Sequence, residues 1–288
     1  MSNLAQIPDD YKKFFDQVLH KYLPKKETIK TLFNHTQADT GDVTLEYVKL
    51  TQSRTAVKGW YSFNDPDPLA DGSAPRAESL GTEDATSSPT TYGQSFKILR
   101  KLMKSSKPII QQYITQHTVE LVSRMENYIN RTLISNMASN AGQSYSTSGG
   151  TWATTGDAVA DVNAMKTQFR IQSGGMEADF AVVNPNEMND LKNDQRFQST
   201  LYTTATPLAS GVITPKPLGL NWIEDEAMTT GTIFVGKKGM FAEYITTEPY
   251  STYTDQLAGG VIGYQMSAVH TFVDQYKMPY YLLYGTGI

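Results

Sequence analysis

The stretch KPIIQQYITQHTVELVSRMENYINRTLISNMAS, residues 107–139, carries the strongest structural signal in the chain. Ser105 and Ser106 precede it as candidate caps, and Pro108 stands where the first turn of a helix tolerates proline. The pattern predicts one helix roughly 45 Å long, longer than most helices of globular proteins. Its apolar residues recur at helical spacing: Ile110, Ile114, Leu121, Met125, Tyr128, Leu133 and Met137.

The segment before this helix predicts a long hairpin. β-branched and aromatic residues indicate extended chain from Val43 to Phe63, and a second extended run follows at 92–103. Between them, residues 64–90 contain four prolines and a run of acidic residues opposed only by Arg76, which is typical of a loop. A loop of this length in a compact domain is usually functional or disordered, and we favour a function.

The N-terminal region predicts a helix over residues 9–33, interrupted at Pro24. Its lysines, Lys30 among them, lie mostly off the apolar stripe and are predicted to form a solvated face. The stripe consists of Tyr11, Phe14, Phe15, Val18, Leu19 and Tyr22.

The second half of the chain alternates short helices and strands, which places the protein in the α+β class. We expect helices at 157–171 and from Pro185, strands at 178–184 and 222–226, and two further strands within 232–250. Two more strands, joined near Asp274–Met278, are expected to fill 261–284, and residues 197–218 form a loop. In the first of them the alternation of Tyr264, Met266, Ala268 and His270 predicts a half-buried sheet.

Composition excludes several classes of protein. The 288 residues carry 25 Lys and Arg against 29 Asp and Glu, a net charge of -4, which argues against coating nucleic acid by bulk charge. The absence of cysteine excludes disulfides and thiolate metal sites. No apolar run is long enough for a membrane-spanning helix, and the N-terminus does not have the pattern of a signal peptide.

No motif for metal or phosphate binding is complete. The four histidines are scattered and have no ligand spacing. His117 and Glu120 lie three apart on the predicted long helix, but a metal site needs three or four such groups. Residues 231–238 nearly match GxxxxGK[ST], but Lys238 replaces the hydroxyl residue and the intervening residues are bulky. A hairpin turn at GKKG explains this stretch better.

Catalytic patterns are also missing. The sequence has no GxSxG or GxGxxG, and carboxylate pairs such as Asp190 with Asp194, or Glu224 with Glu226, are ordinary on surfaces. We therefore predict no catalytic, cofactor-binding or metal-binding residues and no cofactor. Two aromatic groups could stack on bases, but burial in a core or a subunit contact is the better interpretation: Trp60, Tyr61 and Phe63, and Tyr280, Tyr281 and Tyr284.

The order of these elements resembles the major capsid proteins of tailed bacterial and archaeal viruses, a fold shared with encapsulin shells and the floor of herpesvirus capsids. Residues 92–142 are similar to that family's returning loop arm and spine helix, and 176–197 to the helix–strand–helix stretch of its axial domain. Residues 219–245 are similar to its short strand pairs, and 260–285 to its closing strands. The resemblance covers the chain from about residue 40 to the end.

The resemblance implies a division of the chain into five segments. They are an N-terminal arm (1–40), an extended loop (41–103), a peripheral domain with the spine helix (104–150), an axial domain (151–260) and strands returning to the peripheral domain (261–288). In some family members a loop lysine forms an isopeptide bond with a neighbouring subunit, and Lys49 and Lys58 lie in the corresponding region.

The implied function is structural: a major capsid protein that self-assembles, as pentamers and hexamers, into an icosahedral shell around double-stranded DNA. Implied partners are scaffolding, portal and decoration proteins and non-specific contacts with packaged DNA, without a membrane. The implied location is the virion, assembled in the host cytoplasm. Two alternatives stay open: an encapsulin-like compartment that packages a cargo enzyme, and a ligand-binding or hydrolytic enzyme with a divergent site.

Overall fold

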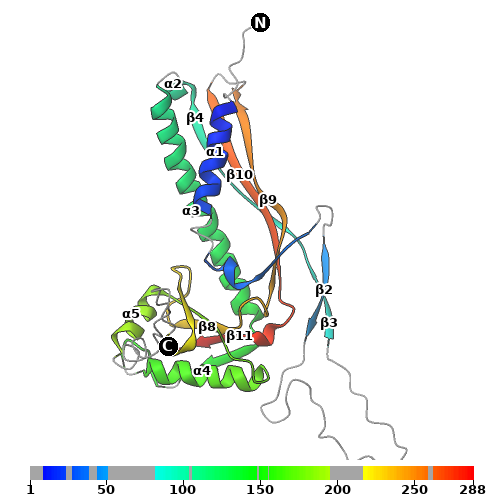
Figure 1. Ribbon diagram of the computed structural model, residues 1–288, viewed down its shortest axis with the longest axis vertical. Helices are drawn as coiled ribbons and strands as arrows, with labels where there is room; N and C mark the ends of the chain where they lie inside the picture. The colour runs from blue at the N-terminus through cyan, green and yellow to red at the C-terminus, as the bar shows by residue number, and fades with distance from the viewer. Residues whose placement is uncertain are drawn as a thin grey trace, which may run out of the picture.

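The structure, a computed structural model, is an α+β fold with an elongated upper part and a broader lower part in the orientation of Figure 1. The predicted fold class is thereby confirmed. The structure describes residues 9–23, 28–38, 44–50, 82–103, 106–147, 149–154, 156–194, 217–258 and 262–288.

The upper part consists of one long helix packed along a sheet. Helix α3 (Lys107–Asn140) confirms the predicted long helix and runs beside the elongated strands (Figure 1). Helix α1 (Asp9–Tyr22) packs against α3, and the short α2 (Arg100–Met103) joins the sheet to α3 at the far end. The strand order is β1 (Asn34–Gln37), β9 (Glu243–Leu257), β10 (Gly263–Gln275) and β4 (Thr90–Leu99).

The lower part surrounds a second sheet. Helix α4 (Ala158–Gln172) begins at Asp157, whose side chain accepts a hydrogen bond from the amide of Ala160, as the sequence predicts for its start. Helix α5 (Pro185–Asn193) begins at Asn184 in the same manner. The five strands lie in the order β5 (Gln143–Ser146), β11 (Leu282–Thr286), β8 (Thr232–Gly236), β6 (Phe180–Val183) and β7 (Asn221–Glu224). The 3₁₀ helices are η2 (Lys30–Leu32), η3 (Pro217–Gly219) and η5 (Pro279–Tyr281).

Two separate hydrophobic cores hold these parts together. The upper core joins α1, the first half of α3, β4 and β10, with the rings of Phe15 and Phe96 packed edge to face at 5.6 Å. The lower core joins the second half of α3, α4, α5 and the five-stranded sheet. Strands β6 and β8 are buried along their whole length, which explains why they read as continuous apolar runs in the sequence.

The structure corrects several predicted boundaries. The predicted hairpin exists, but its returning strand is β3 (Thr82–Ser87), which lies inside the segment predicted as loop. It pairs with β2 (Leu45–Leu50) through inter-strand hydrogen bonds that polar residues can make as well as apolar ones. The second extended run ends at Leu99, where α2 begins. The tip of the hairpin lies outside the described residues.

Three further features differ from expectation. The turn at GKKG is present, but it is not a hairpin, because β8 and β9 belong to different sheets. The N-terminal helix ends at Tyr22, and residues 30–37 form η2 and then β1. The closing strands likewise separate, since β10 belongs to the upper sheet and β11 to the lower one. The division into five segments stays a prediction.

Candidate functional site

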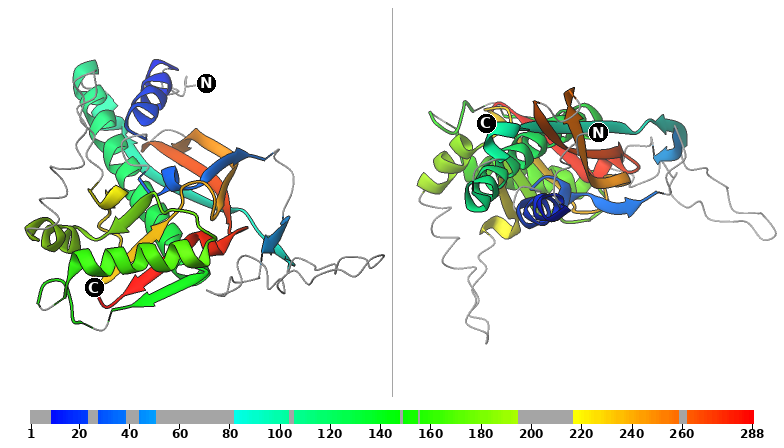
Figure 2. Two further views of the ribbon diagram at one scale, coloured as in Figure 1. Left: turned by 60° about the horizontal axis from the view of Figure 1, so that its bottom comes forward. Right: turned by 90° about the horizontal axis from the view of Figure 1, so that it is seen from above.

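The β2–β3 hairpin stands away from the rest of the molecule (Figure 2, right). Both ends of its strand pair are attached to the chain at and just after the end of β10. Beside the tip, the Leu50 amide donates to the Lys277 carbonyl at 3.0 Å, and at the base Gln275 Nε2 donates to Ser87 Oγ at 3.1 Å. Because residues two apart in a strand share a face, Glu46 and Val48 lie on one face with their opposite partners Thr86 and Asp84. All four side chains are exposed, and the Val48 side chain is 56% exposed.

The far end of the upper part carries a second exposed surface. Leu99 and Ile262 are about half exposed and adjacent, because the Arg100 amide donates to the Ile262 carbonyl at 2.9 Å. Exposed basic side chains, Arg100 and Lys101, follow in α2. This end therefore combines apolar and positive character, whereas the exposed hairpin face combines Val48 with acidic residues.

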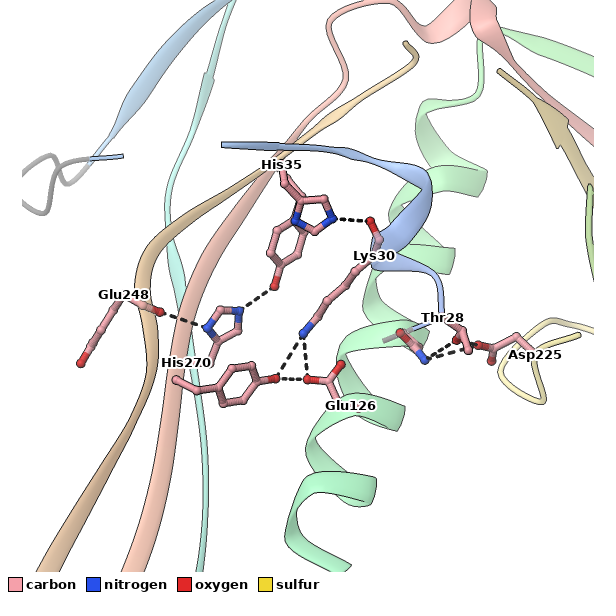
Figure 3. A network of polar contacts seen from close by, with 10 residues as sticks. Thr28, Lys30, His35, Glu126, Asp225, Glu248 and His270 are labelled. Atoms are coloured by element: carbon pink, nitrogen blue, oxygen red, sulfur yellow. Dashed lines mark hydrogen bonds and ion pairs between the residues drawn. The ribbon is translucent and has the colours of Figure 1, made fainter. Parts of the chain in front are cut away.

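Between the two cores lies a group of polar side chains, here called the polar layer (Figure 3): the buried Lys30, Glu126, Tyr244 and His270, and the partly buried Tyr250. Lys30 Nζ is 2.7 Å from Glu126 Oε1 of α3 and 3.2 Å from the Tyr250 hydroxyl, which also donates to Glu126. Lys30 is only 2% exposed, so its charge is compensated inside the protein by Glu126 rather than by water.

His270 forms the other side of this layer. Its ring lies parallel to the Tyr250 ring, with centroids 4.2 Å apart. Nδ1 is 3.0 Å from the Glu248 carbonyl oxygen, which can only accept, so Nδ1 carries the proton and the Tyr244 hydroxyl donates to Nε2 at 2.7 Å. Burial and then the nearby Lys30 charge lower the pKa of His270 to about 3, which keeps its ring neutral.

Residues 28–38 hold this arrangement against α3 and β9. Lys30 O accepts a hydrogen bond from His35 Nε2 at 2.7 Å, and Thr28 Oγ1 donates to Asp225 Oδ2 at 2.8 Å (Figure 3). Further along, the Ala38 amide donates to the Thr246 carbonyl at 3.1 Å. One short segment thus bridges the long helix, the upper sheet and the loop after β7.

The sequence does not predict this layer. Lys30 was predicted on a solvated face and is buried, because the chain leaves the helical pattern before it. Glu126 lies on α3 with the same spacing as apolar residues on either side, the one signal that could have marked it. The predicted burial of Tyr264, Met266, Ala268 and His270 is confirmed.

The rejected chemical motifs have structural roles in the fold. At GKKG, Asp179 accepts a hydrogen bond from the Lys238 amide and pairs with Lys237 Nζ at 3.2 Å, which fixes the turn. His117 Nδ1 lies 3.6 Å from Glu120 beside a hollow of about 260 Å³ between β4 and α3. Among the described residues, no group of three His, Asp or Glu side chains is placed to hold a metal ion.

The aromatic groups and the loop lysines named from the sequence lie in different parts of the chain. Tyr281 is buried in the lower core, and Tyr280 and Tyr284 are partly buried, in agreement with a packing role. Lys49 lies in β2 and is partly buried. Lys58, Trp60, Tyr61 and Phe63 lie outside the described residues. No helix in the described part of the chain is long and apolar enough to span a membrane.

Comparison with known proteins identifies the family. The family model described as phage capsid protein matches residues 82–275, more than half of the chain. The chain belongs to the phage capsid protein family. It is therefore a structural protein of the capsid and a component of the virion, and this result does not favour the encapsulin-like alternative. The sequence of the capsid protein matches none of the curated proteins.

Solved structures share the fold of the capsid protein at very low sequence identity. The capsid of cyanophage P-SCSP1u has a TM-score of 0.61 and 11% identity, covering 90% of this chain and 87% of its own. The virus-like particle from Pyrococcus furiosus has a TM-score of 0.61 and 8% identity, covering 93% and 96%. The capsid of Myoviridae phage XM1 has a TM-score of 0.58 and 9% identity, covering 90% and 91%. The resemblance to tailed-virus capsid proteins is thereby confirmed.

Proposed function

We propose that this capsid protein is the major shell subunit, whose copies assemble as pentamers and hexamers into an icosahedral shell that encloses double-stranded DNA. The observation that carries the proposal is the projecting β2–β3 hairpin, whose outer face is exposed in the single subunit. An exposed Val48 flanked by acidic side chains suits a contact with another copy, which would cover it.

The contact we propose is heterologous: the hairpin face of one copy meets a different surface of the next. Heterologous contacts generate rings or open arrays, and closed shells follow when the geometry closes. The apolar and basic far end around Leu99, Arg100 and Ile262 has the opposite charge to the hairpin, which makes it the complementary surface.

The proposal also covers the partners of the shell, the place of its assembly and its contact with DNA. Scaffolding, portal and decoration proteins would act as separate partners, and assembly would take place in the host cytoplasm before the shell becomes the virion. Contact with packaged DNA would be non-specific, since the net charge of -4 provides no strong grip on phosphate. The five segments would serve as arm, extended loop, peripheral domain, axial domain and returning strands.

Electron microscopy and sedimentation of the purified chain test the proposal. The full chain should form capsomers or shells as its concentration rises. In one variant, a short Gly/Ser linker replaces residues 51–81 and leaves β2 and β3 unchanged. This variant should have the same melting temperature as the full chain but should not form shells. Replacement by a Gly/Ser segment of equal length is the control that separates length from chemistry. A full chain that stays monomeric under all conditions would refute the shell function, and a short-linker variant with normal shells would show that assembly does not need residues 51–81. The role of the exposed β2–β3 face, which this variant keeps, is tested separately by substitution at Val48.

A further inference from the structure

The polar layer divides the upper part of the molecule from the lower part along a single helix. On α3, Leu121, Val122 and Met125 belong to the upper core, whereas Ile129 and Leu133 belong to the lower core. Glu126 lies between the two sets and is completely buried. The two cores can therefore each stay intact when the contacts of the polar layer change.

The sheet is interrupted at the same level. Val269 pairs with Ser251, and Thr271 pairs with Glu248, so two steps along β10 correspond to three along β9. A second extra residue of β9 follows between Glu248 and Thr246, opposite Thr271 and Phe272. Such β-bulges bend a strand and disrupt its ladder. His270 stands at this interruption, and its Nδ1–H supplies a side-chain hydrogen bond to the Glu248 carbonyl.

We propose that the polar layer is an acid-sensitive lock between the two cores: neutral His270 keeps it closed, and protonation of His270 opens it at the β-bulges. The proposal stands on the coincidence of three features at one level: the boundary between the cores, the interrupted ladder, and two groups of hydrogen bonds, around Glu126 and around His270, that meet where the rings of Tyr250 and His270 stack. It concerns the single subunit and is independent of the shell function proposed above.

The groups around His270 cannot accept a second positive charge without rearranging. From residues 28–38, Lys30 contributes a positive charge, and His35 lies beyond Tyr244 with ring centroids 5.3 Å apart. From β9 come the two tyrosine hydroxyls, one of which would have to turn round to accept from a protonated Nε2. From α3 comes Glu126, which already pairs with Lys30.

One carboxylate, that of Glu248, belongs to the bulge itself, although its side chain points away from the His270 ring (Figure 3). The Glu248 side chain accepts hydrogen bonds from Ser251 at 2.9 Å, Tyr253 at 2.8 Å and Thr271 at 3.3 Å. These bonds, with the nearby His270 as the last cause, lower the pKa of Glu248. Its attraction for a protonated His270 is outweighed by burial and by Lys30, since the pKa of His270 still falls to about 3.

The direction of the pH effect follows from linkage. An opened layer exposes His270 to water, where its pKa is 6.5, whereas the closed layer binds a proton only near pH 3. Opening therefore becomes more favourable as pH falls below 6.5, and the gain is complete below pH 3. At pH 4.5 the opening equilibrium should be about a hundredfold larger than at pH 7.

Hydrogen exchange of the full chain at pH 7 and pH 4.5, corrected for intrinsic exchange rates, tests the lock. Peptides covering the bulges, residues 244–252 and 268–272, should lose about a hundredfold in protection at pH 4.5. Peptides from α4 and β6 should keep theirs. His270→Gln, which can still donate and accept, should abolish most of this pH response. His117→Gln, which changes a partly exposed histidine of α3 beside β4, should retain it.

Two outcomes would overturn the proposal. Equal loss of protection across the wild-type chain would mean global acid unfolding, and this readout stands even when the His270→Gln variant fails to fold. An unchanged pH response in a folded His270→Gln variant would show that another group, such as the Lys30–Glu126 pair, senses the acid.

Discussion

At the scale of single residues, the Lys30–Glu126 pair shows how a buried charge shapes the protein. Both side chains are buried, and Lys30 Nζ also lies 5.1 Å from the centre of the Tyr250 ring. Removing two charges from water costs about as much as their attraction returns, so such a pair is weak evidence for stability. Its value lies in specificity, because only this register of residues 28–38 places an ammonium group beside Glu126.

A double-mutant cycle tests this interpretation. Lys30→Met and Glu126→Gln should each destabilise the protein by about 3–5 kcal/mol. The first change leaves the buried Glu126 carboxylate without a positive partner, and the second leaves the buried Lys30 ammonium group with only a neutral amide beside it. The double variant should cost clearly less than the sum of the two. Urea unfolding of the purified chain measures all three. Lys192→Met, which removes the exposed pair with Glu224, is the control and should cost less than about 1 kcal/mol. Additive single effects would contradict the prediction.

At the scale of elements, amphipathic patterning places the helices well. The stripe predicted for α1 is the one that packs, since Tyr11, Phe15 and Leu19 lie in the upper core. The apolar spacing of α3 also predicts its buried face, and the buried side chains pack first into the upper core and then into the lower core along the helix. The strand β3 is the opposite case. Its sequence TEDATS has no apolar periodicity, and pairing with β2 makes it a strand.

The packing of α1 gives a prediction at this scale. Leu19→Ala removes a fully buried side chain from the upper core and should cost about 2–5 kcal/mol. Lys13→Ala on the exposed face of the same helix should change stability by less than about 0.5 kcal/mol. Thermal or urea unfolding compares the two variants. Similar small effects from both would mean that α1 does not contribute to the cooperative core.

At the scale of the whole molecule, the subunit presents surfaces that it cannot cover by itself. The hairpin extends beyond both cores, and the far end carries exposed Leu99 and Ile262 beside basic residues. Single exposed apolar residues are normal on proteins, but Leu99 and Ile262 lie together beside basic side chains, and Val48 lies among acidic ones. This distribution suits a subunit whose remaining contacts come from its neighbours.

Substitution at Val48 tests the hairpin contact. Val48→Asp should leave the stability of the exposed hairpin and of the subunit within about 0.5 kcal/mol, because the side chain is mostly in water. It should raise the protein concentration needed for assembly at least about tenfold, since about 1.4 kcal/mol lost per contact has that effect. Sedimentation and electron microscopy provide the measurement. Val48→Ile is the matched control and should assemble like the wild type; normal assembly by Val48→Asp would exclude this face from the contact.

Local patterns in the sequence are enough to predict the α+β class, the long helix, the stripe of α1 and most strands of the lower part. These follow from local rules, because apolar periodicity, caps and turn residues act between near neighbours in the chain. The resemblance to the capsid family also rested on element order, which the sequence contains.

The position of β3, the sheet that each closing strand joins and the burial of Lys30 depend on tertiary contacts. Each of these depends on a partner far away in sequence: β2 for β3, β5 and β8 for β11, and Glu126 for Lys30. Pairing and charge compensation are set by the fold as a whole, so a polar strand or a buried lysine carries no local signal. The polar layer exists because α3, β9, β10 and residues 28–38 meet at one level, and no single segment encodes that meeting.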